Sequence, residues 1–207
     1  MRQILILTIL FVLLSFKIYI GNDFTESENP QLNALLNKKV PHFTGYLIND
    51  SIVDETLFDN KVILLNFMFI GCQGCMQELS NLAKLNEKYN TSKFMIVTIM
   101  GNGIEDIKSY QGVGDTSKIF YQIRKMWKYE SIKNLIVAEC KFVKQTEPIN
   151  SIQTCTENIS KKFFITAYPT NLLVDKSGII KKRYSNLVDD KEYHDLQFQI
   201  DSLLKLK

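Results

Sequence analysis

Residues 67–78 read FMFIGCQGCMQE, and this stretch places Cys72 and Cys75 at the end of an apolar run. The residues that lead into it, Val62 to Phe69, are mostly aliphatic or aromatic, which is typical of a buried strand. After Cys75 apolar residues recur at helical spacing, and they are Met76, Leu79, Leu82, Ala83 and Leu85. The pattern therefore predicts that the cysteine pair lies where a strand passes into a helix.

The predicted position gives the two sulfur atoms different roles. A cysteine at the first turn of a helix lies near unpaired backbone N–H groups and the positive end of the helix dipole, which favour thiolate over thiol. Cys72 is therefore predicted to attack a substrate disulfide. Cys75, one turn further along, would be more covered and could resolve the mixed disulfide from within the same molecule.

Half of a zinc site is the alternative interpretation of two cysteines at this spacing. Such a site needs two more ligands at suitable spacing, and Cys140 and Cys155 are far away in the sequence. Redox chemistry is therefore predicted ahead of metal binding. No metal site and no cofactor are expected beyond a redox-active disulfide between Cys72 and Cys75.

Composition narrows the class of protein. The chain has 207 residues, of which 45% are hydrophobic and 23% charged, so it can bury one core and is expected to form one domain. The formal net charge is +3 and there is no long run of lysine or arginine. Composition therefore gives no reason to expect a nucleic-acid partner.

The N-terminal residues are predicted to lie outside this domain. Arg2 precedes an almost unbroken apolar stretch, Ile4 to Phe16, and Lys17 follows it. This length fits the apolar region of a signal peptide better than a full membrane span, although no Ala-x-Ala cleavage site follows. Residues 1–21 are therefore predicted to be a signal peptide or, if Lys17 snorkels and residues 4–20 are retained, an inner-membrane anchor. Either outcome predicts a periplasmic or other extracytoplasmic location.

The remaining chain divides into a linker and a folded domain. Residues 22–37 are polar and are predicted to be a linker with one helical turn around Leu32, and residues 38–207 are predicted to be the domain. The domain includes an extended insertion around residues 102–160. A helix over residues 116–129 is predicted to face the core with its apolar side chains, which are Ile119, Phe120, Ile123, Met126 and Trp127.

Four segments, taken in order, resemble a known family. They are NKKVPHFTGYLIND at 37–50, LFDNKVILLNFMF at 57–69, the cysteine pair with Glu78 three residues on, and AYPTNLLVDKSGII at 167–180. Together they resemble the thioredoxin-like TlpA/ResA family of exported thiol-disulfide oxidoreductases, in the redoxin (AhpC-TSA) superfamily. The resemblance implies an α/β thioredoxin-like fold, in which a central mixed β-sheet is flanked by helices.

The resemblance also implies roles for individual residues. Cys72 corresponds to the family's nucleophile, Cys75 to its resolving thiol and Pro169 to a cis-proline that faces them. Glu78 corresponds to an acidic residue that, in reductive members, lies near the pair and modulates its titration. A solvated glutamate favoured by the helix dipole is the alternative at this position. Asn66 stands where thioredoxins proper have a buried Asp and many exported relatives have Asn.

Two positions depart from the family pattern. Many members have Trp before the first cysteine and Pro before the second, whereas this chain has Gly71 and Gly74. Without the proline a rigid turn is lost and the surroundings of both sulfur atoms change. The resemblance therefore leaves the reduction potential and the preferred partner open.

Residues 139–156 bring a second cysteine pair, Cys140 and Cys155. In an exported protein an even cysteine count suggests a structural disulfide between them. Two unpaired thiols are one alternative. A relay in which this pair exchanges with Cys72 and Cys75 is another.

The predicted function is that of an exported thiol-disulfide oxidoreductase. The resemblance implies a reductant of disulfides in extracytoplasmic proteins, as in cytochrome c maturation, recharged by a membrane thiol electron donor. A peroxiredoxin-like antioxidant is an alternative, but Phe69 replaces the Thr of its Pro-x-x-x-Thr-x-x-Cys signature. An SCO-like copper-delivery module is another, but that family spaces its cysteines by three residues and adds a His.

Overall fold

The structure is a computed structural model, and it describes residues 29–89, 92–126, 134–140 and 159–206. The predicted signal or anchor segment, residues 1–21, lies outside these ranges. Among the described helices, none combines the length and the apolar character that a membrane span requires.

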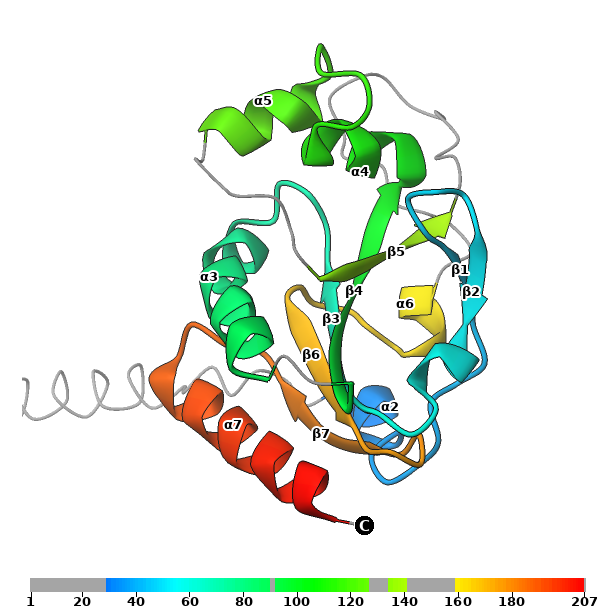
Figure 1. Cartoon of the computed structure of the whole chain (residues 1–207), viewed down its shortest axis with the longest axis vertical. Helices are drawn as coiled ribbons and strands as arrows, with labels where there is room; N and C mark the ends of the chain where they lie inside the picture. The colour runs from blue at the N-terminus through cyan, green and yellow to red at the C-terminus, as the bar shows by residue number, and fades with distance from the viewer. Residues whose placement is uncertain (1–28, 90–91, 127–133, 141–158, 207) are drawn as a thin grey trace, which may run out of the picture.

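Within the described residues, seven strands form one mixed sheet in the order β2-β1-β5-β4-β3-β6-β7 (Figure 1). Strands β3, β4 and β5 run parallel in the middle, and the outer strands pair antiparallel at both edges. All seven residues of β3 are buried, as expected for a central strand covered on both faces. The bounds are β1 Thr44–Tyr46, β2 Ile52–Asp54, β3 Val62–Met68, β4 Phe94–Gly103, β5 Leu135–Cys140, β6 Thr170–Val174 and β7 Ile180–Tyr184.

Helices cover both faces of this sheet (Figure 1). Successive residues of β3 alternate between the faces, so Val62 and Leu64 pack with α3 and α7, whereas Ile63 and Leu65 pack with α2 and α6. The predicted α/β architecture with helices flanking a mixed sheet is confirmed. The helices are α2 Pro30–Asn33, η1 Glu55–Phe58, α3 Gln73–Lys88, α4 Ile104–Gln111, α5 Ile119–Met126, α6 Ile159–Lys162 and α7 Asp190–Lys205.

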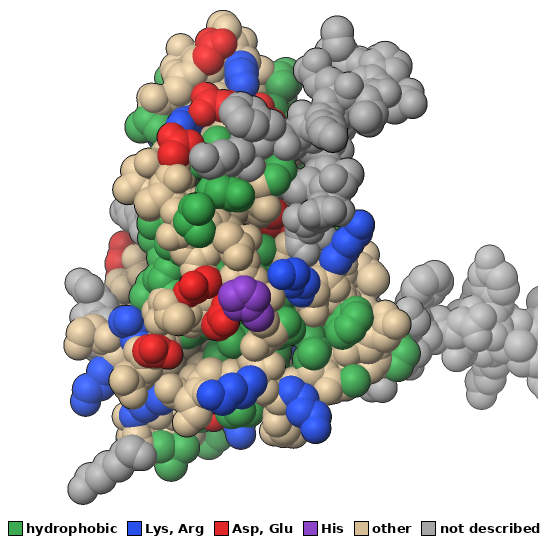
Figure 2. Space-filling view, turned by 90° about the vertical axis from the view of Figure 1, so that its right-hand side faces the viewer, with side chains coloured by type: hydrophobic (Ala, Val, Ile, Leu, Met, Phe, Trp, Pro, Cys, Tyr) green, Lys and Arg blue, Asp and Glu red, His purple; other side chains and the backbone are tan. Residues whose placement is uncertain are grey.

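The surface that carries β1, β2 and α6 has mixed charge (Figure 2). Among the coloured side chains in this view, acidic and basic groups are interspersed, with hydrophobic side chains between them. Charged side chains from different elements also form ion pairs. For example, Lys108 on α4 pairs with Asp50, with 3.1 Å between Nζ and Oδ2. Charge alone therefore does not mark a binding surface on this face.

The folded domain begins before the expected boundary at residue 38. Residues 29–37, assigned to the linker from their polarity, pack against the sheet through Leu32, which is 2% exposed. The Asn29 side chain caps α2 through the N–H groups of Gln31 and Leu32, and its Nδ2 donates to the carbonyl of Phe164 at 2.7 Å. A short turn with a single buried leucine has no long hydrophobic period, so the sequence pattern does not reveal this packing.

We expect Leu32→Ala to lower the free energy of unfolding by about 2–5 kcal/mol, the range for removing a fully buried leucine side chain. Leu206→Ala is a matched control, because Leu206 is 62% exposed and its truncation should change stability by less than about 0.5 kcal/mol. Urea unfolding of both variants measures the difference. Equal effects in the two variants would show that residues 29–37 do not belong to the folded domain.

The predicted core face of residues 116–129 is wrong in part. Ile119 is 65% exposed and Met126 is 70% exposed, and only Phe120 and Ile123 pack against the core. The reason is that α5 lies on α4 rather than on the sheet (Figure 1), with Arg124 donating to the Gln111 carbonyl at 2.7 Å. A helix that packs on another helix contacts it only along a narrow stripe, so Ile119 and Met126 stay exposed. Trp127 lies outside the described residues.

Candidate redox-active site

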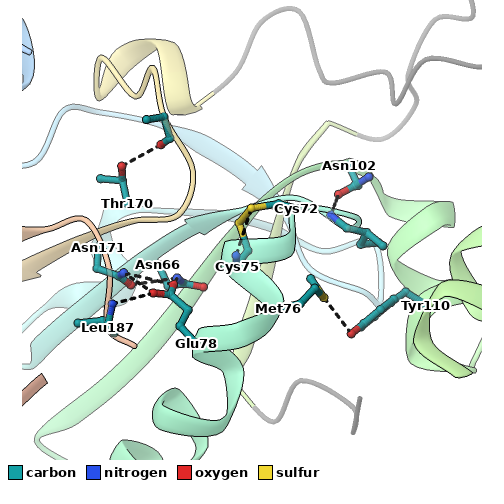
Figure 3. Close-up of a disulfide and its surroundings, with 12 residues drawn as sticks. Asn66, Cys72, Cys75, Met76, Glu78, Asn102, Tyr110, Thr170, Asn171 and Leu187 are labelled. Carbon is teal, nitrogen blue, oxygen red and sulfur yellow. Dashed lines mark hydrogen bonds between the residues drawn. A yellow bond between two sulfur atoms is a disulfide. The ribbon is translucent and has the colours of Figure 1, made fainter. Parts of the chain in front are cut away.

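The cysteine pair lies at the predicted junction between strand and helix. Strand β3 ends at Met68, and Cys72 is the N-cap residue of α3. Cys72 and Cys75 form a disulfide with an S–S distance of 2.08 Å (Figure 3). The backbone N–H of Cys75 donates to Cys72 Sγ at 3.2 Å. A donor at this place would stabilise negative charge on Cys72 after the disulfide is reduced.

The two sulfur atoms differ in access. Cys72 is 8% exposed, and Cys75 is completely buried. Cys72 is therefore the more exposed of the two cysteines and the one that an incoming thiol or disulfide would meet first. This difference agrees with the predicted order of attack, in which Cys72 meets the substrate and Cys75 acts from within.

The two glycines that depart from the family pattern have local structural reasons. Gly71 has a φ of 98°, a left-handed value that favours glycine over residues with a side chain. A Cβ atom on Gly74 would lie 3.2 Å from Pro169 Cδ, closer than ordinary van der Waals contact. The absence of side chains thus lets the chain turn into α3 and lets Pro169 approach the dithiol turn.

Pro169 lies on the loop that faces the pair, as predicted. The peptide bond between Tyr168 and Pro169 is cis. The Thr170 hydroxyl donates to the Ala167 carbonyl at 2.8 Å, which closes the loop across the proline (Figure 3). The contact with Gly74 places this loop directly against the dithiol turn.

Glu78 is buried rather than solvated, so the alternative of an exposed first-turn glutamate is wrong. Its side chain is 0% exposed. Asn66 Nδ2 donates to Glu78 Oε1 at 2.6 Å, and Asn171 Nδ2 donates to both carboxyl oxygens at 3.2 Å. The backbone N–H of Leu187 donates to Oε2 at 3.3 Å. Figure 3 shows the carboxyl group directed toward the two amides, one helical turn beyond Cys75.

Burial raises the pKa of Glu78 to about 7, because the charged form is poorly solvated there. The hydrogen bonds from Asn171, Leu187 and Asn66 act in the opposite direction and lower the pKa. Asn66 Oδ1 is buried without a hydrogen-bond partner among the described residues. Turning this amide over would present that oxygen to a protonated Glu78. Both protonation states of the carboxyl group are thus accessible near neutral pH.

Sequence reasoning missed Asn171 and Leu187 as partners of Glu78. Asn171 lies opposite Asn66 in the antiparallel register of β3 and β6, and so the two amides meet on the same face. One signal was present in the sequence, since Asn66 is the single polar residue of β3 and Asn171 directly precedes the apolar residues of β6.

A buried asparagine also supports the turn before the dithiol. Asn102 Oδ1 accepts a hydrogen bond from the Ile70 N–H at 2.7 Å (Figure 3). It lies where the pairing of β4 with β5 shifts register, between Met100 and Gly103. Strand β4 thus continues past Met100 to Gly103, and its Asn102 side chain holds the backbone that leads into Cys72.

The second cysteine pair is only partly described. Cys140 ends β5 and is disulfide-bonded. Cys155 lies outside the described residues, so the bridge between Cys140 and Cys155 stays a prediction. Across the described ranges, no three His, Cys, Asp or Glu side chains are grouped so that they could hold a metal ion.

Solved structures with the same fold are known. No protein-family model matches the chain, and no curated protein sequence matches it significantly. The thioredoxin domain of a thiol-disulfide oxidoreductase from Bacteroides vulgatus matches with a TM-score of 0.55 and 17% identity, over 80% of this chain and 97% of that one. A thiol-disulfide isomerase from Corynebacterium glutamicum matches with a TM-score of 0.54 and 15% identity, over 83% and 98%. Likenesses at these identities establish the fold, and the chain is therefore a thioredoxin-like α/β protein with a Cys72–Cys75 disulfide at the first turn of α3.

Proposed function

We propose that this protein is a thiol-disulfide oxidoreductase that exchanges disulfides with other proteins through Cys72 and Cys75. The observation that carries the proposal is the disulfide at the start of α3, in which Cys72 keeps some exposed surface and Cys75 keeps none. The apposed Pro169 loop and the buried Glu78 support it. So do the names of the structural neighbours, which are described as thiol-disulfide oxidoreductases or isomerases.

In the reducing direction the reaction has two exchange steps. The Cys72 thiolate attacks one sulfur of the substrate disulfide, which forms a mixed disulfide and releases the first substrate thiolate. Cys75 then loses its proton and attacks Cys72 Sγ, which releases the second substrate thiolate and forms the Cys72–Cys75 disulfide. Two electrons pass from the dithiol to the substrate, and the released thiolates take up protons from the solvent. An external thiol donor must reduce Cys72 and Cys75 before the next cycle.

Glu78 tunes the charge balance of these steps. It lies one helical turn beyond Cys75, and its carboxyl group is removed from solvent. A buried negative charge one helical turn from Cys75 is poorly screened by solvent. It therefore opposes a second negative charge on the Cys75 sulfur. The charge on Glu78 therefore links the exchange rate to pH around 7, where this carboxyl group titrates.

The proposed setting is extracytoplasmic, with exported disulfide-containing proteins as substrates. Support comes from the apolar segment at residues 4–20, from Asn66 and from the resemblance to the TlpA/ResA family. By that resemblance the protein would act as a reductant in a process like cytochrome c maturation, with a membrane thiol protein as its electron donor.

Equilibrating the protein in glutathione buffers tests the direction of transfer. We expect the potential of the Cys72/Cys75 couple to lie near that of thioredoxin, about −270 mV, which suits a reductant. A value near about −120 mV would mean an oxidant instead. Reduction of insulin disulfides in the presence of a thiol donor tests the activity itself, and a rate equal to that of the donor alone would refute the proposal.

A further inference from the structure

A second buried carboxyl group lies outside the dithiol site. Glu139, on β5, is 3% exposed, and Ser160, on α6, is 2% exposed. The Ser160 hydroxyl donates to Glu139 Oε1, and the Ser160 N–H donates to the same oxygen at 3.2 Å. The Tyr168 hydroxyl donates in turn to Ser160 Oγ at 3.0 Å. A chain of hydrogen bonds thus runs from β5 through α6 to the loop of Pro169.

The carboxyl group fixes the direction of this chain. An ionised Glu139 can only accept, so Ser160 must donate to it and Tyr168 must donate to Ser160. Burial raises the pKa of Glu139 to about 6, and its Oε2 has no hydrogen-bond partner among the described residues. A buried carboxyl group with one satisfied oxygen is unfavourable on its own account. We therefore expect the Glu139 carboxyl group to have a role through the Ser160 side chain that it holds by hydrogen bonds.

Tyr168 connects the two sides of the dithiol site. Its ring packs edge-on against Phe69, with the ring centroids 5.3 Å apart and an interplanar angle of 85°. Phe69 begins the turn to the dithiol, because its carbonyl accepts the Cys72 N–H at 3.2 Å. On the other side, Tyr168 is bonded directly to Pro169, which packs against Gly74. Moving the Tyr168 ring would therefore move the loop relative to Cys72.

We propose that Glu139 and Ser160 are positioning residues that hold Tyr168 in place, and that they thereby set the affinity of the site for the polypeptide around a substrate disulfide. The inference rests on the proposed function and adds to it a determinant of substrate class. Because Pro169 lies against Gly74 in the dithiol turn, we expect a polypeptide that brings its disulfide to Cys72 to contact the Tyr168–Pro169 loop. A small disulfide can reach Cys72 without that loop.

Activity on a protein disulfide and on a small disulfide distinguishes this role from simple stabilisation of the fold. The measured quantity is the ratio of kcat/KM for insulin to kcat/KM for hydroxyethyl disulfide. Tyr168→Phe keeps the ring against Phe69 and removes only the hydroxyl, and we expect it to lower the ratio about 5-fold through a higher KM for insulin. Ser160→Ala should lower the ratio by a similar factor. The double variant should lower it no further, because both changes break one chain.

Tyr184→Phe is the matched control. Tyr184 is also buried, and its hydroxyl donates to a carboxylate, Asp195 Oδ2, at 2.8 Å, but it lies in the separate cluster under α7. We expect the Tyr184→Phe protein to have the same ratio of kcat/KM for insulin to kcat/KM for hydroxyethyl disulfide as the wild type. An unchanged ratio in Tyr168→Phe and Ser160→Ala, or an equal fall in Tyr184→Phe, would overturn the positioning role alone. A wild-type protein inactive on both disulfides would refute the proposed function and this role with it.

Discussion

Replacing Cys75 by serine should turn the protein into a trap that holds its substrate as a mixed disulfide on Cys72. The reason is that this variant lacks the buried sulfur that would otherwise attack Cys72 Sγ and release the substrate. Replacing Cys72 by serine should instead lower the exchange rate by on the order of 1,000-fold or more, because it removes the sulfur of the more exposed cysteine, which is the proposed nucleophile. Non-reducing electrophoresis and mass spectrometry identify the trapped species.

The second cysteine pair provides the control for this experiment. A variant with Cys140 and Cys155 both replaced by serine should keep exchange activity, and trapping by Cys75→Ser should persist in that background. Loss of trapping there would support the relay between the two pairs. Equal activity of the wild type, Cys72→Ser and Cys75→Ser would contradict the assignment of the dithiol.

Glu78→Gln should remove a large part of the dependence of stability on pH. The folded-state pKa of Glu78 is about 7, whereas its ordinary value is 4.5, so between these values the folded state binds more protons than the unfolded state. Stability therefore falls as pH rises through this window, by about 3 kcal/mol from this one group. Glutamine carries no charge and should lack this decline.

Urea unfolding of the oxidised protein at pH 4.5, 6 and 8 measures this effect. The Cys72–Cys75 disulfide keeps these two thiols from titrating, and comparison of the wild type with Glu78→Gln cancels the contribution of Glu139. Asn171→Ala is a useful companion, since loss of its amide donor should move the midpoint of the decline to higher pH. Parallel pH profiles for the wild type and Glu78→Gln would show that Glu78 does not titrate in this window.

The central strand and the dithiol junction could be predicted from the sequence, because local pattern decides both. A strand buried on both faces appears as an unbroken apolar run, and the helix after it has an amphipathic period over four turns. The hairpin of β6 and β7 was predictable for the same reason, since Lys176-Ser177-Gly178 marks its turn.

The contacts that complete the site are long-range, and no local pattern encodes them. Asn171 meets Glu78 across 93 residues of sequence, and Ser160 meets Glu139 across 21. Whether Glu78 is solvated or buried depends on Leu187, which belongs to the segment between β7 and α7 and lies 109 residues away in sequence. The exposed side of α5 was not predictable for the same reason. The spacing of its apolar residues predicts a helix but does not say whether that helix lies on the sheet or on α4.

The measurement that tests the central claim most directly is the stoichiometry of a single turnover. Protein reduced at Cys72 and Cys75 is mixed with insulin without any other thiol, and free thiols on insulin and peptide-mapped disulfides on the protein are counted. We expect one Cys72–Cys75 disulfide to form for each insulin disulfide reduced. Insulin reduced without formation of that disulfide, or a Cys72–Cys75 dithiol left intact beside unreduced insulin, would contradict the account.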